Sequence, residues 1–290
     1  MSLIVPEAPK NVAMRAHFSH MAAANDLMPD IEQAILDTDV LILEALGWSG
    51  ALEVALRDAV HRKVKPQQAG TDFLFGQSGP FMLALTRKLY DSPATPFVCF
   101  NDVPAGTPTV ATFAEAHMAL SDLEKALILG WREKSFEEVI EYCRPLYMQL
   151  NAAKLKRANH MLKRLSVTVN RARKQQAFSE AKSPLRVLML TGIDYVDLGQ
   201  QLGLAAEQES TFTVRATKQV SIDTCMIAQL REYAAEGTIS TVSIAAPIAR
   251  TLLLNARLPK NGQLTHELRS AVDLEVATMD ITDIKRLYEG

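Results

Sequence analysis

The chain has 290 residues, and its formal net charge at pH 7 is −2. Hydrophobic residues make up 48% of it and charged residues 22%, which is typical of a globular protein that buries a sizeable core. The near-neutral balance excludes, for the chain as a whole, both a nucleic-acid-binding polycation and a strongly acidic solvating protein.

The cysteines and the apolar runs indicate the compartment. Cys99, Cys143 and Cys225 are odd in number and far apart, so they predict neither a disulfide framework nor a cysteine zinc site. No apolar run approaches the roughly 20 residues that span a bilayer. Prolines and a glutamate interrupt the apolar patch in MSLIVPEAPK before a signal-peptide core could form. We therefore expect a cytoplasmic protein in a reducing compartment.

Short apolar runs predict the strands. Helical stretches separate them, and most of the runs are almost continuously apolar, which is typical of a mainly parallel sheet that helices cover on both faces. The sequence therefore predicts an α/β fold. The predicted strands are VAMRAHF (12–18), DVLILEAL (39–46), PFVCF (96–100), LRVLML (185–190) and TFTVRA (211–216), with STVSIAA (240–246) as a further candidate.

Helix boundaries can also be read from the chain. Ser135 and Glu138 have the spacing of a capping box, and Gly237 is a good residue for a helix C-cap. Residues 112–182 contain no convincing strand and predict three or four helices. We interpret this region as a helical insertion or cap within a single α/β domain that spans residues 1–290.

Polar side chains follow the predicted strands. In open parallel sheets the carboxyl ends of the strands meet at one edge, where ligands bind. Histidines and carboxylates there could hold a divalent cation or act as a general acid and base without a metal. Polar residues are also common at strand ends because the chain reaches the surface there. The residues concerned are His17 and His20, Glu44, Asn101 and Asp102, and Asp194.

Glu44 stands out among these residues because its neighbours in VLILEALGW are apolar. A carboxylate there is either at the rim of the strand or partly buried with a partner, since burial alone costs several kcal/mol. We expect that partner to be His17 or His20, a bound cation, or an arginine.

The stretch HFSH followed by DTDVLILE resembles the first part of the TraB/Tiki family, which is grouped with erythromycin esterase-like and ChaN-like proteins. In this comparison His20 occupies the motif histidine and Glu44 the motif glutamate. His17 stands where the motif has glycine. The resemblance covers residues 11–48 and a later segment, 165–215.

The later segment contains LTGIDYVDL, which is similar to the family's second motif. Asp194 replaces the histidine of that motif, and Arg171 matches an arginine that precedes the strand. Aspartate can ligate a divalent cation but is a poorer base near neutral pH. The resemblance implies a metal-dependent hydrolase, and the altered motif positions leave a non-catalytic descendant open.

The first functional hypothesis is accordingly a hydrolase that cleaves an amide or ester bond in a peptide or small-molecule substrate. Water would attack the carbonyl after activation by a divalent metal (manganese, zinc or iron) or by histidine. The sequence leaves a homo-oligomer open. The expected catalytic residues are His20, Glu44, Asp194 and Arg171, and the expected metal ligands are His17, His20, Glu44 and Asp194.

The second hypothesis is a non-catalytic binding protein. The helical stretch 154–174 is basic, and Arg157, Arg164 and Arg171 recur every seven residues, so they could present one face to an anionic partner. The simpler interpretation is a solvated helix face that acidic residues elsewhere balance. The remaining histidines are expected to be exposed or locally hydrogen-bonded; these are His61, His117, His160 and His266.

Overall fold

The computed structural model divides the chain into two compact units. The α/β unit comprises Ile4–Thr107 and Ala158–Lys218, and the helical unit comprises Met1–Leu3, Pro108–Arg157 and Gln219–Gly290. The structure describes residues 12–19, 31–65, 79–130, 133–174, 184–195, 197–198, 211–216, 224–258 and 265–290.

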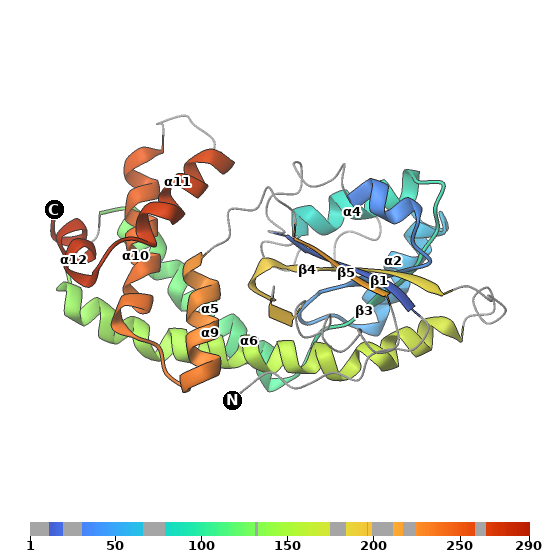
Figure 1. The fold of residues 1–290 in the computed structure, drawn as a ribbon, viewed down its shortest axis with the longest axis horizontal. Coiled ribbons are helices and arrows are strands. Elements are labelled where there is room, and N and C mark those ends of the chain that lie inside the picture. Colours follow the sequence, from blue (N-terminus) through green and yellow to red (C-terminus); the bar gives the residue numbers. More distant parts are fainter. Residues whose placement is uncertain are drawn as a thin grey trace. The chain divides into compact units, whose positions relative to one another are not determined.

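The α/β unit is built on a sheet packed between helices (Figure 1). The sheet has five strands in the order β3-β2-β4-β1-β5. All four neighbouring pairs are parallel. The five predicted strands and the α/β fold class are confirmed. The strands are β1 (Val12–Ser19), β2 (Val40–Leu43), β3 (Phe97–Phe100), β4 (Leu185–Gly192) and β5 (Thr211–Ala216).

Helices cover this sheet on both faces. On one face, α2 (Gly50–Val60) and α4 (Gly79–Asp91) pack on a buried cluster that includes Leu43 and Leu190. On the other face, the second half of α6 lies against the end of β3, where the side chain of Asn101 donates to the carbonyl of Met161 at 2.9 Å. The near-continuous apolar strands reflect this burial on both sides.

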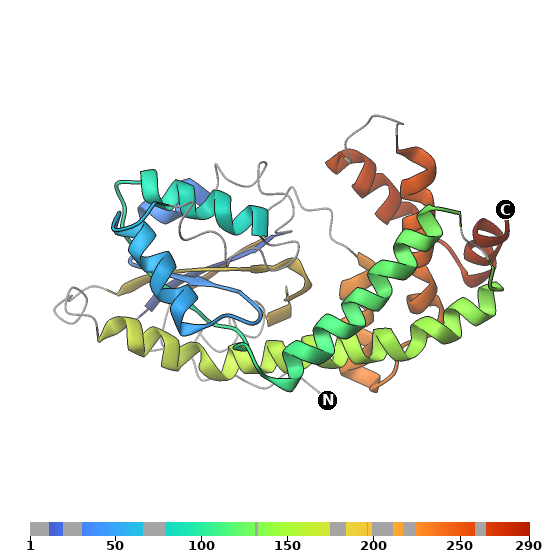
Figure 2. The ribbon, with the colours of Figure 1, turned by 180° about the vertical axis from the view of Figure 1, so that it is seen from behind.

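In the described residues of the predicted helical insertion, 112–130 and 133–174, the structure has two long helices, α5 (Pro108–Ile128) and α6 (Phe136–Arg173). The predicted capping box opens α6: Ser135 N donates to Glu138 Oε2 at 2.7 Å, and Glu138 N donates to Ser135 Oγ at 3.3 Å. The helix then continues through Pro145. Its first half belongs to the helical unit and its second half to the α/β unit (Figure 2).

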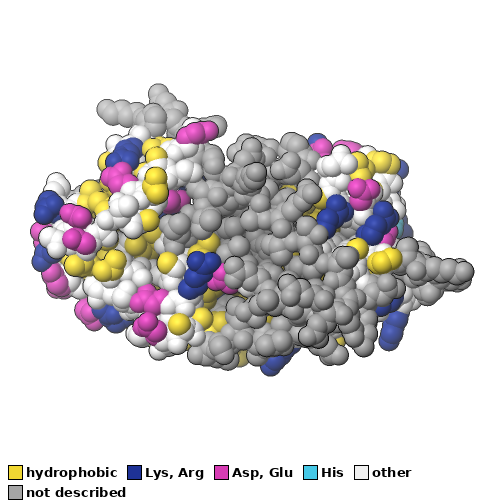
Figure 3. Space-filling model, viewed as in Figure 1, with side chains coloured by type: hydrophobic (Ala, Val, Ile, Leu, Met, Phe, Trp, Pro, Cys, Tyr) yellow, Lys and Arg dark blue, Asp and Glu magenta, His cyan; other side chains and the backbone are white. Residues whose placement is uncertain are grey.

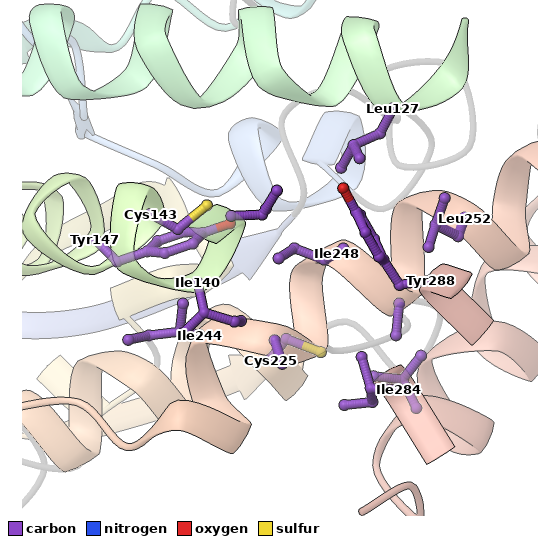
Figure 4. Packing of buried hydrophobic residues seen from close by; sticks show 14 of the residues in the cluster. Leu127, Ile140, Cys143, Tyr147, Cys225, Ile244, Ile248, Leu252, Ile284 and Tyr288 are labelled. Carbon is purple, nitrogen blue, oxygen red and sulfur yellow. The ribbon is translucent and has the colours of Figure 1, made fainter. Parts of the chain in front are cut away.

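The helical unit adds α9–α12 to α5 and the first half of α6. Its core is a buried cluster in which Ile248 and Tyr288 lie among aliphatic side chains and two cysteines (Figure 4). Gly237 adopts φ +73° directly after α9, as predicted for a C-cap. The helices are α9 (Thr224–Glu236), α10 (Thr241–Arg257), α11 (His266–Val276) and α12 (Ile281–Glu289).

The strand candidate at 240–246 is wrong, because this segment opens α10. Ser240 is the N-cap, and its side chain accepts from Ser243 N at 3.3 Å. Ile244, Ile248 and Leu252 are buried at helical spacing along the same helix. The apolar run is short, and runs of this length fit a strand and a buried helix equally well.

The three cysteines are buried free thiols. Burial, and next the carboxylate of Glu53, raise the pKa of Cys99 to about 12. Burial likewise raises the pKa of Cys143 to about 12. Among the described residues, no helix has both the length and the apolar character needed to cross a membrane.

The core of the helical unit should be sensitive to lost volume. Ile248 is 2% exposed, so Ile248→Ala is expected to lower the free energy of unfolding by about 2–5 kcal/mol through lost burial and a cavity. Leu274, on α11, is 72% exposed, and Leu274→Ala should change it by about 0.5 kcal/mol or less. Urea denaturation measures both, and equal losses would contradict this packing.

Candidate functional site

Glu44 directly follows β2, and its carboxylate is held by the end of β4. Its Oε2 accepts from the hydroxyl of Thr191 at 2.6 Å and from the backbone N–H of Gly192 at 2.6 Å. Thr191 is buried and Glu44 is half-buried. Two short hydrogen bonds to one oxygen fix the orientation of this carboxylate at the carboxyl edge of the sheet.

Glycine at position 192 permits this close approach. A Cβ atom placed on Gly192 would lie 3.3 Å from Glu44 Oε2, which is tighter than ordinary van der Waals contact. The expected partners of Glu44 were a histidine, a cation or an arginine. The structure shows two neutral donors to Glu44, Thr191 and Gly192, which the sequence did not identify as partners.

The register of the sheet separates the predicted site residues into rows. Leu43, Leu190 and His17 lie in one row across β2, β4 and β1, and Thr191 lies in the next row. Successive residues of a strand alternate between the two faces, so Glu44 and Thr191 lie on the face opposite the α2 and α4 cluster. His17 therefore lies in the row of Leu43 and Leu190, one row before Thr191, which bonds to Glu44.

Asp194 lies in a short 3₁₀ helix, Ile193–Tyr195, directly after β4. It is half-buried and follows the two groups that hold Glu44, so both carboxylates belong to the same edge of the sheet. The side chain of His17 and the whole of His20 lie outside the described residues. Within the described part of the chain, no three histidine, cysteine or acidic residues form a group that could hold a metal ion.

Asn101 and Asp102, which follow β3, anchor neighbouring elements. The side-chain oxygen of Asn101 accepts from the hydroxyl of Thr168 on α6 at 3.3 Å. The carbonyl of Asp102 accepts from Trp48 Nε1 at 2.8 Å, and its carboxylate accepts from Val103 N at 2.6 Å. These contacts attach α6 and the segment after β2 to the end of β3.

Arg171, predicted as a catalytic residue, pairs with Glu53 on α2 at 2.8 Å. The same carboxylate pairs with Arg57 at 2.7 Å and accepts the backbone N–H of Phe100 at 3.1 Å. Burial alone would lower the pKa of Arg171, but the hydrogen bond and charge of Glu53 raise it above its ordinary value. This pairing is consistent with a structural role for Arg171.

Glu53 was not predicted from the sequence, yet its spacing carries a signal. It lies three and seven residues before Leu56 and Val60, two buried residues of α2, so it shares their face. Arg57 follows it by four residues, which places a cation within reach. A carboxylate on an apolar helix face with an arginine at that spacing predicts a buried ion pair.

The basic stripe predicted on α6 is not an open face. Arg157 is 5% exposed, and its guanidinium lies 5.2 Å from the centroid of the Phe113 ring. Arg171 is engaged with Glu53, while Arg164 is half-buried. On the face of the helical unit seen in Figure 3, basic and acidic side chains are interspersed, so no single sign of charge dominates it.

His160, on α6, was expected to be exposed or locally hydrogen-bonded. It is half-buried and makes a hydrogen bond to the backbone of Asp102. Its Nε2 is buried and has no hydrogen-bond partner among the described residues. Burial and the nearby Arg164 lower the pKa of His160, while Asp102 acts in the opposite direction.

Compared with protein-family models, curated proteins and solved structures, the chain gives no match. The TraB/Tiki resemblance therefore stays a prediction from the motifs.

The hydrogen bond from Thr191 to Glu44 can be measured with a double-mutant cycle. Thr191→Val keeps the shape of the side chain but removes the donor, and should lower the free energy of unfolding by about 1–3 kcal/mol. In a Glu44→Leu background the same change should cost much less, because the carboxylate is gone. Equal costs in the two backgrounds, by urea denaturation, would argue against the interaction.

Proposed function

We propose that the protein is a hydrolase that cleaves an amide or ester bond of a peptide or small molecule at the carboxyl edge of its parallel sheet. Glu44 is the central residue of the proposed site. The supporting observation is the fixed carboxylate: Glu44 accepts from Thr191 and Gly192 at 2.6 Å, and Asp194 follows Gly192 by two residues. The TraB/Tiki resemblance of residues 11–48 supports the same assignment.

Each residue has a role in this proposal. Glu44 orients or deprotonates the attacking water, because a held carboxylate is a defined acceptor at one position. Thr191 and Gly192 keep that carboxylate in place. Asp194 supplies a second negative charge at the same edge. Arg171 is assigned to docking α6 through Glu53, which replaces the catalytic role expected from the sequence.

A divalent metal is compatible with the donor set but depends on histidine. Glu44 and Asp194 provide the oxygen ligands that hard and borderline cations prefer. A complete site also needs an imidazole of His20 or His17, since the described residues hold no group of three ligands. A metal bound there would lower the pKa of a coordinated water and make it a nucleophile near neutral pH.

Glu44→Gln tests the catalytic proposal. It keeps hydrogen-bonding capacity but removes the charge, and should reduce hydrolysis of p-nitrophenyl esters or fluorogenic peptides by about 10²- to 10⁴-fold. Asp91→Asn, at an exposed carboxylate of the same unit, is the control and should retain full activity. Unchanged turnover in the Glu44 variant would remove the mechanism.

The metal is tested separately on protein purified without chelators or nickel resin. Near-stoichiometric manganese, zinc or iron, measured by elemental analysis, is expected in the wild type and should disappear in His20→Ala. Metal-free wild-type protein whose stability does not respond to added cations would leave histidine and carboxylate chemistry without a metal.

The binding hypothesis is the alternative, and the burial of Arg157 weakens it. Within 154–174 the side chains of Lys156, Lys163 and Lys174 are exposed, and those of Arg164 and Arg173 are half-buried. If an anionic partner docks there, Arg164→Glu should abolish binding, whereas His20→Ala should leave binding unchanged. We also propose a cytoplasmic location, with which three free buried thiols agree.

A further inference from the structure

His160 has one ring nitrogen in use and one without a partner among the described residues. The hydrogen bond to the backbone of Asp102 raises the pKa of His160, so it stabilises a protonated ring nitrogen. In this bond the imidazole N–H therefore donates and the carbonyl of Asp102 accepts. Since the described residues offer Nε2 no partner, the donor is Nδ1. The neutral imidazole therefore has a fixed tautomer, with the Nε2 lone pair turned into a buried position.

The charges around this ring oppose a second proton. The charged groups that act on it are Arg164, one helical turn further along α6, and Asp102, at the end of β3. Burial and Arg164 together outweigh the attraction of Asp102 and lower the pKa of His160. The ring is consequently neutral at pH 7, and its Asp102 contact is made by an uncharged donor.

We propose that His160 is a pH-sensitive latch, which holds α6 on the turn after β3 while the imidazole is neutral and releases it on protonation. Three features carry the proposal: the contact with Asp102, the buried Nε2 to which the described residues offer no acceptor, and the guanidinium of Arg164 on the same helix face.

Protonation breaks the latch because it creates a buried donor for which the described part of the chain holds no acceptor. A charged Nε2–H must reach water, since buried unpaired charges are strongly disfavoured. Turning the ring outward satisfies Nε2 but removes Nδ1 from the carbonyl of Asp102.

The direction of the pH dependence follows from the depressed pKa. In the unfolded chain a histidine has a pKa of about 6.5. Above that pH neither state binds the proton and the latch contributes fully. As the pH falls below it, the unfolded or released state takes up the proton first, so the contribution is lost progressively until the lower pKa of docked His160 is reached.

This latch lies next to the proposed site and would regulate it. The regulatory role rests on the proposed function, but the latch itself does not. Met161, which follows His160, accepts the side-chain hydrogen bond of Asn101, and the backbone N–H of Asn101 donates to the carbonyl of Leu43 at 3.0 Å. Glu44 directly follows Leu43 in the sequence. Release of α6 at acid pH therefore disturbs the strand end that carries Glu44.

Hydrogen exchange of the amides in 158–173 tests the proposal without a substrate. After correction for intrinsic rates, we expect protection in the wild type to fall by about tenfold between pH 7.5 and 5, because the released helix takes up a proton that the docked helix excludes. His160→Asn places a non-titrating donor near the position of Nδ1 and should lose most of this extra fall. His61→Asn, at an exposed histidine of the same unit, is the matched control and should behave as wild type.

Arg164→Gln provides a second route if His160→Asn does not fold. Removing the guanidinium should raise the pKa of His160 and reduce the acid-induced loss of protection. A His160 imidazole that titrates at or above about 6.5 by NMR would overturn the proposal, because no differential binding of the proton would then exist. The same corrected acceleration in wild type and His160→Asn would also overturn it. Either result leaves the test of Glu44→Gln intact.

Discussion

The α/β unit depends on a charge that has been taken out of water. Glu53 is 2% exposed, and its carboxylate joins α2, α6 and the outer edge of the sheet. Phe97 and Asn101 donate their backbone N–H groups to carbonyls of the segment 39–43. Because N–H groups alternate in direction along a strand, the N–H of Phe100 points away from that segment, and it donates to the carboxylate of Glu53. Two arginines balance the charge. Removing either would leave a buried carboxylate underpaired, which is usually strongly destabilising.

The sheet could be predicted from the sequence because strands that are buried on both faces consist of nearly uninterrupted apolar residues. Helix ends could be predicted as well, since Ser135 and Gly237 act through local hydrogen bonds and φ rather than distant partners. The prediction for the segment 240–246 failed for the opposite reason. Its identity as a helix depends on which neighbours bury Ile244 and Ile248, and that is a tertiary property.

Glu44 was identified from its apolar surroundings, but its partners could not be. Which residue of β4 meets it depends on register, and a shift by one residue would exchange the faces. The spacing of the three arginines could be predicted from the sequence, but the exposure of each one on α6 could not. Burial of Arg157 beside Phe113 depends on α5, which no spacing within α6 reveals. The environment of His160 could not be predicted for the same reason, because it depends on the position of Asp102.

The placement of the cysteines gives each unit its own chemical reporter. Cys99 lies in β3, whereas Cys143 and Cys225 lie in the core of the helical unit. A thiol reagent requires both access and a thiolate, and burial withholds both from Cys99 and Cys143. The rate at which each sulfur is labelled therefore follows the opening of the unit around it, so the loosening of one unit can be timed independently of the other.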